Sequence, residues 1–195
     1  FGMWNGAVKV NTATDTDTNV ATVPAKLDWS TFFTNTSGLV PAVIPQVGAG
    51  VGIEAQGSVA LDAFGVLIAK GSFKIQLGTV THRGADNALG GTGANADTTY
   101  QAMSLTLGSS AFAGATKVEV FVGIGGALDD VNADNALSTG TFSDDTVNIS
   151  AGLGFYASLD SLSLVTLKNN NATPLVATDD KSYMALEISG LTAKL

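Results

Sequence analysis

Cysteine is absent from the 195-residue chain, and histidine occurs once, as His82. Without cysteine the protein can form neither a disulfide framework nor a thiolate site. Basic residues are also few, because nine Lys and Arg stand against 17 Asp and Glu, which gives a formal net charge of -8. Proteins that bind nucleic acid need clustered cations to displace phosphate counterions. We therefore expect no nucleic-acid partner.

Charged residues of both signs and long apolar runs are scarce as well. Charged residues make up 13% of the chain, about half of the roughly 25% found in ordinary soluble domains. Gly, Ser, Asp or Lys interrupts every apolar stretch before it reaches the roughly 18 residues of a spanning helix, so we expect no transmembrane segment. Thr, Ser, Asn and Gly supply much of the polarity instead. This composition is typical of bacterial secreted and surface proteins, and we expect an extracellular or cell-surface location.

The chain does contain a repeated two-residue alternation. Residues 51–61 and 67–77 both alternate apolar and polar side chains. The polar positions are Glu54, Gln56, Ser58, Lys70, Ser72, Lys74 and Gln76. This period is that of a strand with one buried face and one solvated face. We predict a hairpin over 51–77 whose apolar side faces the core and whose polar side faces water.

Further strand-like segments follow, at residues 102–107, 117–124, 146–156, 159–167 and 183–195. Gly, Asn, Asp and Thr dominate the segments between them and favour turns. One short helical pattern occurs, over residues 29–40, and it stops before a proline. The sequence therefore predicts a single β-rich domain or repeat unit over residues 1–195, all-β and mainly antiparallel, with long Gly/Asn/Asp-rich loops and at most one short helix. Its arrangement is open between a sandwich, a rolled sheet and a hairpin-built β-solenoid.

Both ends of the chain have the pattern of strands. The alternation over 183–195 continues to the last residue, and residues 1–10 alternate again without an initiator Met. This pattern predicts a unit of a longer repetitive protein, in which the final strand pairs with, or continues into, the first strand of a neighbour. The expected interface residues are Trp4, Val8, Val10, Leu186, Ile188, Leu191 and Leu195.

Four short motifs occur in an order that resembles a known class of proteins. They are Gly57-Ser-Val-Ala-Leu-Asp-Ala-Phe-Gly65, Gly71-Ser-Phe-Lys-Ile75, Phe121-Val-Gly-Ile-Gly-Gly-Ala-Leu-Asp129 and Tyr183-Met-Ala-Leu-Glu-Ile-Ser-Gly-Leu191. Together they resemble the tandem repeats of very large bacterial secreted or surface proteins, often described as adhesin-like. The resemblance implies a repetitive extracellular β-structure whose partners are copies of itself or adjacent repeats, rather than an enzyme.

Candidate catalytic groups are few and far apart in the sequence. His82 stands at the end of a predicted strand, where an exposed loop-edge residue is a more common role than a general base or metal ligand. Glu54, Glu119 and Glu187 each occupy the polar phase of a strand, which indicates solvated positions rather than the paired carboxylates of a glycosidase. The sequence therefore predicts no enzyme. A hydrolase would require His82, Glu54 or Glu119 to line a cleft.

Acidic loops are the pattern that most favours a bound ligand. Asp129, Asp130, Asp134, Asp144 and Asp145 lie within or beside one Gly/Asn-rich loop. Carboxylates at short spacing suit Ca²⁺, which takes about 6 to 8 oxygen ligands. The loop lacks the central glycine and distal glutamate of an EF-hand. Solvated turn residues and a calcium site therefore both stay open as interpretations.

The aromatic residues allow two functions as well. Trp4, Trp29, Phe32, Phe33 and Tyr100 could stack on sugar rings, or they could fill the core where units or sheet ends meet. The leading hypothesis is a structural subunit or repeat of an extracellular bacterial fibre, stalk or surface layer, joined through strand pairing at its termini. The alternative is a calcium-dependent adhesin or a carbohydrate-binding module whose partner is a host or matrix glycan.

Overall fold

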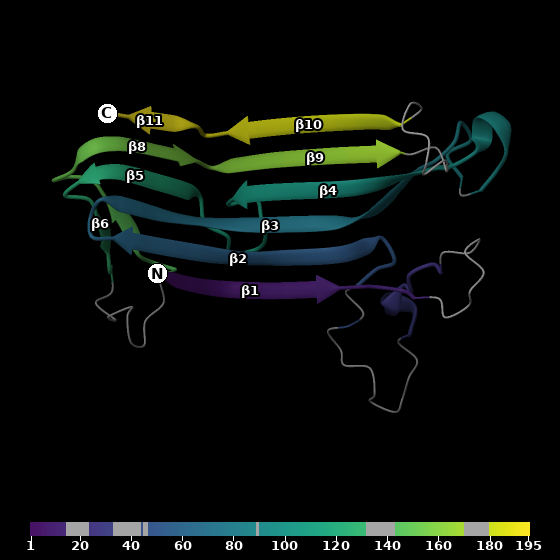
Figure 1. Cartoon of the computed structure of the whole chain (residues 1–195), viewed down its shortest axis with the longest axis horizontal. Coiled ribbons are helices and arrows are strands. Elements are labelled where there is room, and N and C mark those ends of the chain that lie inside the picture. The colour runs from purple at the N-terminus through teal and green to yellow at the C-terminus, as the bar shows by residue number, and fades with distance from the viewer. Residues whose placement is uncertain (15–23, 33–43, 45–46, 89, 132–142, 170–179) are drawn as a thin grey trace.

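The computed structural model describes residues 1–14, 24–32, 44, 47–88, 90–131, 143–169 and 180–195, and antiparallel strands dominate it (Figure 1). The strands are β1 (Gly2–Val10), β2 (Val51–Ala63), β3 (Leu67–His82), β4 (Thr98–Gly108), β5 (Val118–Ile124), β6 (Ala127–Asp129), β7 (Thr146–Asn148), β8 (Leu153–Leu159), β9 (Ser161–Asn169), β10 (Lys181–Ser189) and β11 (Thr192–Lys194). The described part also holds two short 3₁₀ turns, η1 (Trp29–Phe32) and η3 (Gly93–Asn95), and no α-helix. The predicted all-β, mainly antiparallel class is confirmed.

Nine of the strands form one large sheet of six rows. β1 pairs with β2 and β2 with β3, and the far side of the long β3 pairs with β4 over one part and with β5 over another. The next row holds β9 and β8, and the last row holds β10 and β11. Every neighbouring pair is antiparallel. β1 and the β10–β11 row are therefore the two edges of the sheet (Figure 1).

The predicted hairpin of residues 51–77 is the centre of this sheet. β2 pairs along its whole length with residues 67–78 of β3. At the turn, the Gly65 amide donates a 2.9 Å hydrogen bond to the Asp62 carboxylate, and Phe64 and Gly65 both adopt positive φ. Glycine takes this conformation without strain. The link between the two alternating segments is thus a tight turn.

A small second sheet, formed by β6 and β7, covers one end of the large sheet. The side chains that pack together between the two sheets are Leu128, Val147 and Ile149 on one side and Ile68, Phe121 and Tyr156 on the other. Phe121 is only 1% exposed. Glycine makes room for its ring, since a Cβ on Gly126 or Gly152 would lie 2.4 or 2.9 Å from a ring carbon. Among the described strands, this end is where two layers form a core.

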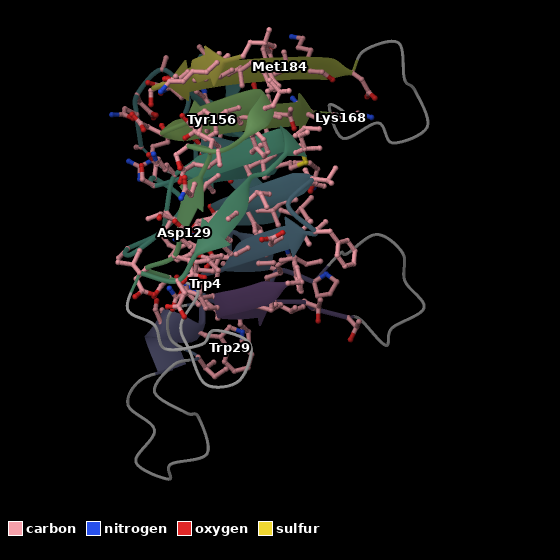
Figure 2. The ribbon with its side chains drawn as sticks, turned by 90° about the vertical axis from the view of Figure 1, so that its left-hand side faces the viewer. Trp4, Trp29, Asp129, Tyr156, Lys168 and Met184 are labelled. Atoms are coloured by element: carbon pink, nitrogen blue, oxygen red, sulfur yellow. The ribbon has the colours of Figure 1, made fainter. Side chains whose placement is uncertain are left out.

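The two faces of the large sheet differ in composition. Alternation places charged side chains on the face that β6 and β7 partly cover, which we call the polar face: Lys9, Glu54, Lys70, Lys74, Glu119 and Glu187. The opposite face, which we call the apolar face, carries Val8, Ile53, Leu77, Leu105, Val122, Phe155, Leu164 and Leu186, among others. Figure 2 shows Trp4 and Tyr156 towards one side of the sheet and Met184 and Lys168 towards the other.

The burial of these faces reverses the sequence prediction. The alternation predicts solvated positions for the polar residues, but Glu54, Ser58, Lys70 and Ser72 are at most 6% exposed. Leu77, which should face the core, is 40% exposed. The prediction was wrong for two reasons. β6, β7 and residues 143–145 lie over one end of the polar face, around Lys70, and neither β6 nor β7 covers the apolar face. Further along the polar face, Lys9, Lys74 and Gln76 contact Glu54 and shield it from water.

Three segments differ in extent from the prediction. Residues 146–156 divide into β7 and β8, which belong to different sheets, and a 2.9 Å hydrogen bond from the Gly152 amide to the Ile149 carbonyl closes the turn between them. Residues 183–195 divide into β10 and β11. The short helix over 29–40 is reduced to η1 in its described part. Within the described residues, no helix has the length and hydrophobicity to cross a membrane.

Candidate assembly edges and the charged groups of the sheet

β1 forms one edge of the large sheet and contains three predicted interface residues. Its outer side pairs with no strand among the described residues. Val8 and Val10 lie on the apolar face and are 70% and 57% exposed. Trp4 lies on the polar face, where the Lys70 ammonium stands 5.8 Å from the centre of its ring. The strand is broken at Asn5, whose φ is 54°, and the ladder with β2 shifts there.

β10 and β11 form the opposite edge. The predicted interface residues on or beside these strands are Leu186, Ile188, Leu191 and Leu195. Every residue over 181–195 is exposed. This edge also contains a break, at Gly190, whose φ is 64° and whose missing Cβ would lie 2.1 Å from the carboxylate of Asp160. Both edges are thus exposed strands with a single break in each.

Glu54 is the centre of a buried charge cluster that joins β1, β2 and β3. Its carboxylate lies 2.9 Å from the Lys9 ammonium and 3.3 Å from the Lys74 ammonium, and the Gln76 amide donates a 2.6 Å hydrogen bond to it. Burial disfavours the charged form, but the hydrogen bonds and charges of these three partners outweigh it and lower the pKa of Glu54. Glu54 therefore links the edge strand to the centre of the sheet.

Lys70 is a buried cation on the same face. Its ammonium donates hydrogen bonds to the backbone carbonyls of Asp145 and, at 2.9 Å, Ser143. Burial lowers the pKa of Lys70, and the negative charges of Asp145, Glu119 and Asp144 counteract part of that effect. The lysine side chain thus brings a positive charge to one end of the acidic loop.

The predicted metal ligands do not converge in the described part of the chain. Those described are Asp129, Asp130, Asp144 and Asp145, and Asp134 lies outside the described residues. Asp144 and Asp145 lie near Lys70, whereas the Asp129 carboxylate accepts a 2.7 Å hydrogen bond from the Asn148 amide. No three acidic or histidine side chains among the described residues are placed to hold a metal ion. Calcium binding stays a prediction.

The remaining candidates for hydrolysis, Glu119 and His82, lie on different strands. Glu119 accepts a 2.7 Å hydrogen bond from the Tyr156 hydroxyl and lies 3.0 Å from the Lys117 ammonium. Burial and this carboxylate raise the pKa of Tyr156, and hydrogen bonding to Glu119 raises the pKa of Lys117. His82 is exposed at the end of β3, as predicted. Glu119 is therefore a structural partner of two neighbours rather than a free acid.

The predicted aromatic surface is divided among several places. Trp29 donates a 3.2 Å hydrogen bond from its indole to the Asn11 side chain, far along β1 from Trp4. The Tyr100 ring meets Tyr183 edge to face, with 5.9 Å between ring centres. Phe32 ends η1, and Phe33 lies outside the described residues. The aromatic residues thus do not share one binding surface.

Tyr183, the ring partner of Tyr100, was not predicted as a site residue. The alternation pattern of the sequence marked it only as part of the terminal strand. Together with Tyr100, Val80, His82 and Leu167 it borders an open hollow of about 590 Å³ at one end of the sheet. The pairing of Val80 with Tyr100 and of Leu167 with Tyr183 places these side chains on the polar face. The pairing of β3 with β4, β4 with β9 and β9 with β10 brings these side chains together from distant parts of the sequence.

Comparisons with known proteins found no match: no protein-family model matches the chain, and no curated protein or solved structure is significantly similar to it. Function is therefore inferred from the residues and geometry of the chain itself.

Proposed function

We propose that the protein is a structural subunit or repeat of an extracellular fibre, stalk or surface layer, joined to its neighbours by pairing between β1 of one copy and β10–β11 of the next. The observation that carries this proposal is the position of these strands, which are opposite edges of a single sheet. An edge strand presents backbone donors and acceptors that another strand can satisfy. Two different edges on one unit favour head-to-tail contacts, which can continue without closing.

The strand directions support a direct continuation of the sheet. Each of the six rows runs antiparallel to the next, so β10 and β11 run opposite to β1. If a second copy is shifted sideways without rotation, its β1 therefore runs antiparallel to β10 and β11 of the first copy. The two termini lie at the same end of the sheet (Figure 1), so this arrangement suits both separate molecules and consecutive repeats of one chain.

The side chains favour one register for this contact. With Val8 opposite Ile188 of the neighbour, apolar side chains from both copies meet on the apolar face. The same register places Lys9 opposite Glu187 on the polar face, where opposite charges across a ladder attract each other. A shift by one residue would put every side chain on the wrong face.

The breaks in the two edges also match in this register. Trp4 and Ala7 both lie on the polar face although they are three positions apart, because the bulge at Asn5 changes the phase of the strand. Ser189 and Thr192 show the same phase change around Gly190. In the proposed register Trp4 faces Thr192 and Ala7 faces Ser189, so the faces agree on both sides of the breaks. A shift by two residues would place each break opposite regular strand.

The absence of cysteine allows this register to be tested by disulfide formation. Val8→Cys and Ile188→Cys are prepared as separate proteins, mixed and mildly oxidised. Directly opposite residues of an antiparallel ladder have Cα atoms about 4.5–5.5 Å apart, which is within reach of a disulfide. We expect a mixed disulfide between positions 8 and 188 as the main product, measured on non-reducing gels and by mass spectrometry.

The matched control mixes Val8→Cys with Leu186→Cys. Position 186 lies on the same face of β10 as position 188, two residues away from it. We expect that pair to cross-link several times less. Equal cross-linking of the two pairs would contradict the register. A wild-type chain that stays monomeric at high concentration, with no mixed disulfide from either pair, would contradict edge assembly itself.

Glycan binding is a second candidate function, favoured by the hollow beside Tyr100 and Tyr183. Two tyrosine rings at an open hollow can pack against the apolar face of a sugar and offer hydroxyls to its polar groups. We expect a glycan panel to contain a ligand whose binding is lost in Tyr100→Ala. If the wild-type chain binds no glycan on the panel, this candidate is removed while edge assembly is unaffected.

A further inference from the structure

The apolar face is an extensive surface of the described sheet whose role edge pairing does not explain. It extends over all six rows, from Val8 on β1 to Leu186 on β10, and both of these residues are more than half exposed. Near the middle of the sheet, Leu77 and Val122 are still 40% and 49% exposed. Edge-to-edge pairing would lengthen this face without covering it. Apolar areas of this size on a protein surface mark sites of interaction.

The charges of the described strands lie almost wholly on the other face. Across the six rows, the apolar face carries one charged side chain, Lys168, which stands near one end and is paired with Asp180 at 3.0 Å. Covering this face would therefore desolvate little charge, and unpaired buried charges are the main cost of burying a protein surface. The charged side chains of the polar face would remain on the outside.

The shape and size of the face suit another sheet. Six rows spaced about 4.8 Å apart and a longest strand of 16 residues give a surface of roughly 25 by 50 Å. Two such surfaces in contact would bury on the order of 2,400 Å², more than the 1,200–2,000 Å² of a standard stable interface. Small residues such as Ala55 and Ala69 lie beside large ones such as Phe73, which allows side chains of facing sheets to interdigitate.

Charge distinguishes between the possible occupants. A lipid surface is bound by apolar faces flanked by basic residues, because bacterial and cytoplasmic membrane surfaces carry anionic lipids. This chain is acidic, and its described strands place a single lysine on the face. A second copy needs no charge complementarity, since its own apolar face carries equally little charge.

We propose that the apolar faces of two copies of this chain pack against each other, so that the single large sheet becomes half of a two-layer sandwich. This contact is separate from the edges and does not depend on edge pairing. Together, the two contacts would give a fibre or layer two sheets thick, with charged groups on both outer surfaces. Aligned sheets in such sandwiches pack about 10 Å apart.

A matched pair of lysine substitutions tests the proposal. Leu77→Lys places a charge on the apolar face and Val165→Lys places one on the polar face, and the two wild-type side chains are 40% and 38% exposed. Because both positions are open in a single copy, neither change should unfold it, which circular dichroism can verify. Sedimentation velocity over a range of concentrations measures association. We expect Leu77→Lys to weaken dimer formation on the order of 100-fold, the effect of an unpaired charge in an apolar interface, and Val165→Lys to change it less than about threefold.

Repeating the measurement with Glu187→Lys distinguishes the edge contact from the face-to-face contact. In the proposed edge register, this change places the new lysine opposite Lys9 of the neighbouring copy. This variant should stop longer assemblies and leave the dimer. A monomeric wild-type chain at all concentrations, or equal weakening by Leu77→Lys and Val165→Lys, would overturn the face-to-face contact. Flotation with phosphatidylcholine vesicles gives the remaining outcome: a chain that is monomeric in solution but binds vesicles through Leu77 would assign the face to lipid and overturn the proposal.

Discussion

The polar and apolar faces of the sheet are built from alternate residues of the same strands, yet they differ in how they are stabilised. On the polar face, Phe121 is 1% exposed beneath β6 and β7, and Glu54 and Lys70 have charged or carbonyl partners within the chain. On the apolar face, Phe155 lies in the next position of the same ladder and is 45% exposed. Alternation therefore identifies which residues share a face, but it does not tell which face the chain covers by itself.

This difference assigns separate physical roles to the faces. Contacts that a single copy completes, such as those of Phe121 and Glu54, contribute to its own folding free energy. Contacts that it leaves open contribute only when another surface covers them. Changes on the polar face should therefore alter stability at every concentration, and changes on the apolar face should alter stability only where copies associate.

The largest expected effect comes from two phenylalanines on opposite faces. Phe121→Ala removes a buried ring between the two sheets and should lower the free energy of unfolding by about 3–5 kcal/mol. Phe155→Ala should cost less than about 1 kcal/mol in dilute solution, because nearly half of that ring is already in water. Urea denaturation at low protein concentration measures both. Equal losses would mean that the apolar face is covered within a single copy.

The next effect compares two lysines. Lys70→Met keeps an unbranched side chain but leaves the carbonyls of Ser143 and Asp145 without their donor, so we expect a loss of about 2–4 kcal/mol. Lys168→Met, on the apolar face, removes an exposed ion pair and should change stability by less than about 0.5 kcal/mol. Thermal unfolding of both variants provides the measurement. A neutral Lys70→Met would show that these carbonyls are satisfied without the lysine.

Much of the fold could be predicted from local patterns. The alternation of residues 51–77 predicted a hairpin, and the alternation from residue 183 predicted a terminal strand. The side of each strand that is buried could not be predicted, because it depends on β6 and β7, two three-residue strands with little pattern of their own. A half-buried strand and a strand with one open apolar face have the same two-residue period.

For the candidate sites, too, local sequence patterns predicted only part of what the structure contains. Trp4, Val8, Leu186 and Ile188 were predicted as interface residues, a role that stays a prediction, and they lie on the two edge strands. Contacts between side chains of distant segments, such as Lys9 with Glu54 or Tyr100 with Tyr183, became visible only through cross-strand register. Register depends on long-range contacts, and it cannot be read from the composition of one segment.

A smaller effect is expected from a buried hydroxyl pair on the polar face. The Ser58 and Ser72 oxygens are 2.6 Å apart, and the Thr116 amide donates a 2.7 Å hydrogen bond to Ser72. Ser72→Ala leaves the buried Ser58 hydroxyl and the half-buried Thr116 amide with one partner fewer, and we expect a loss of about 1–2 kcal/mol. The control is Ser182→Ala on the exposed apolar face of β10, which should be neutral in chemical denaturation. Equal effects would mean that the hydroxyl pair is not what stabilises this position.

The smallest expected effect concerns pH. The pKa of Glu54 is lowered in the folded chain from an ordinary value near 4.5, so the folded state binds fewer protons than the unfolded state just below that pH. The contribution of Glu54 to stability is therefore complete above about pH 4.5 and is lost as pH falls through the lowered pKa. Glu54→Gln should flatten the decline in unfolding free energy between pH 5 and pH 3, roughly the range in which a carboxylate titrates. Glu187→Gln, the same substitution on the exposed edge strand, provides the comparison. If Glu187→Gln flattened the curve as much as Glu54→Gln, the acid sensitivity would belong to the open edge, and the polar face would lose its distinction as the side that the single chain stabilises.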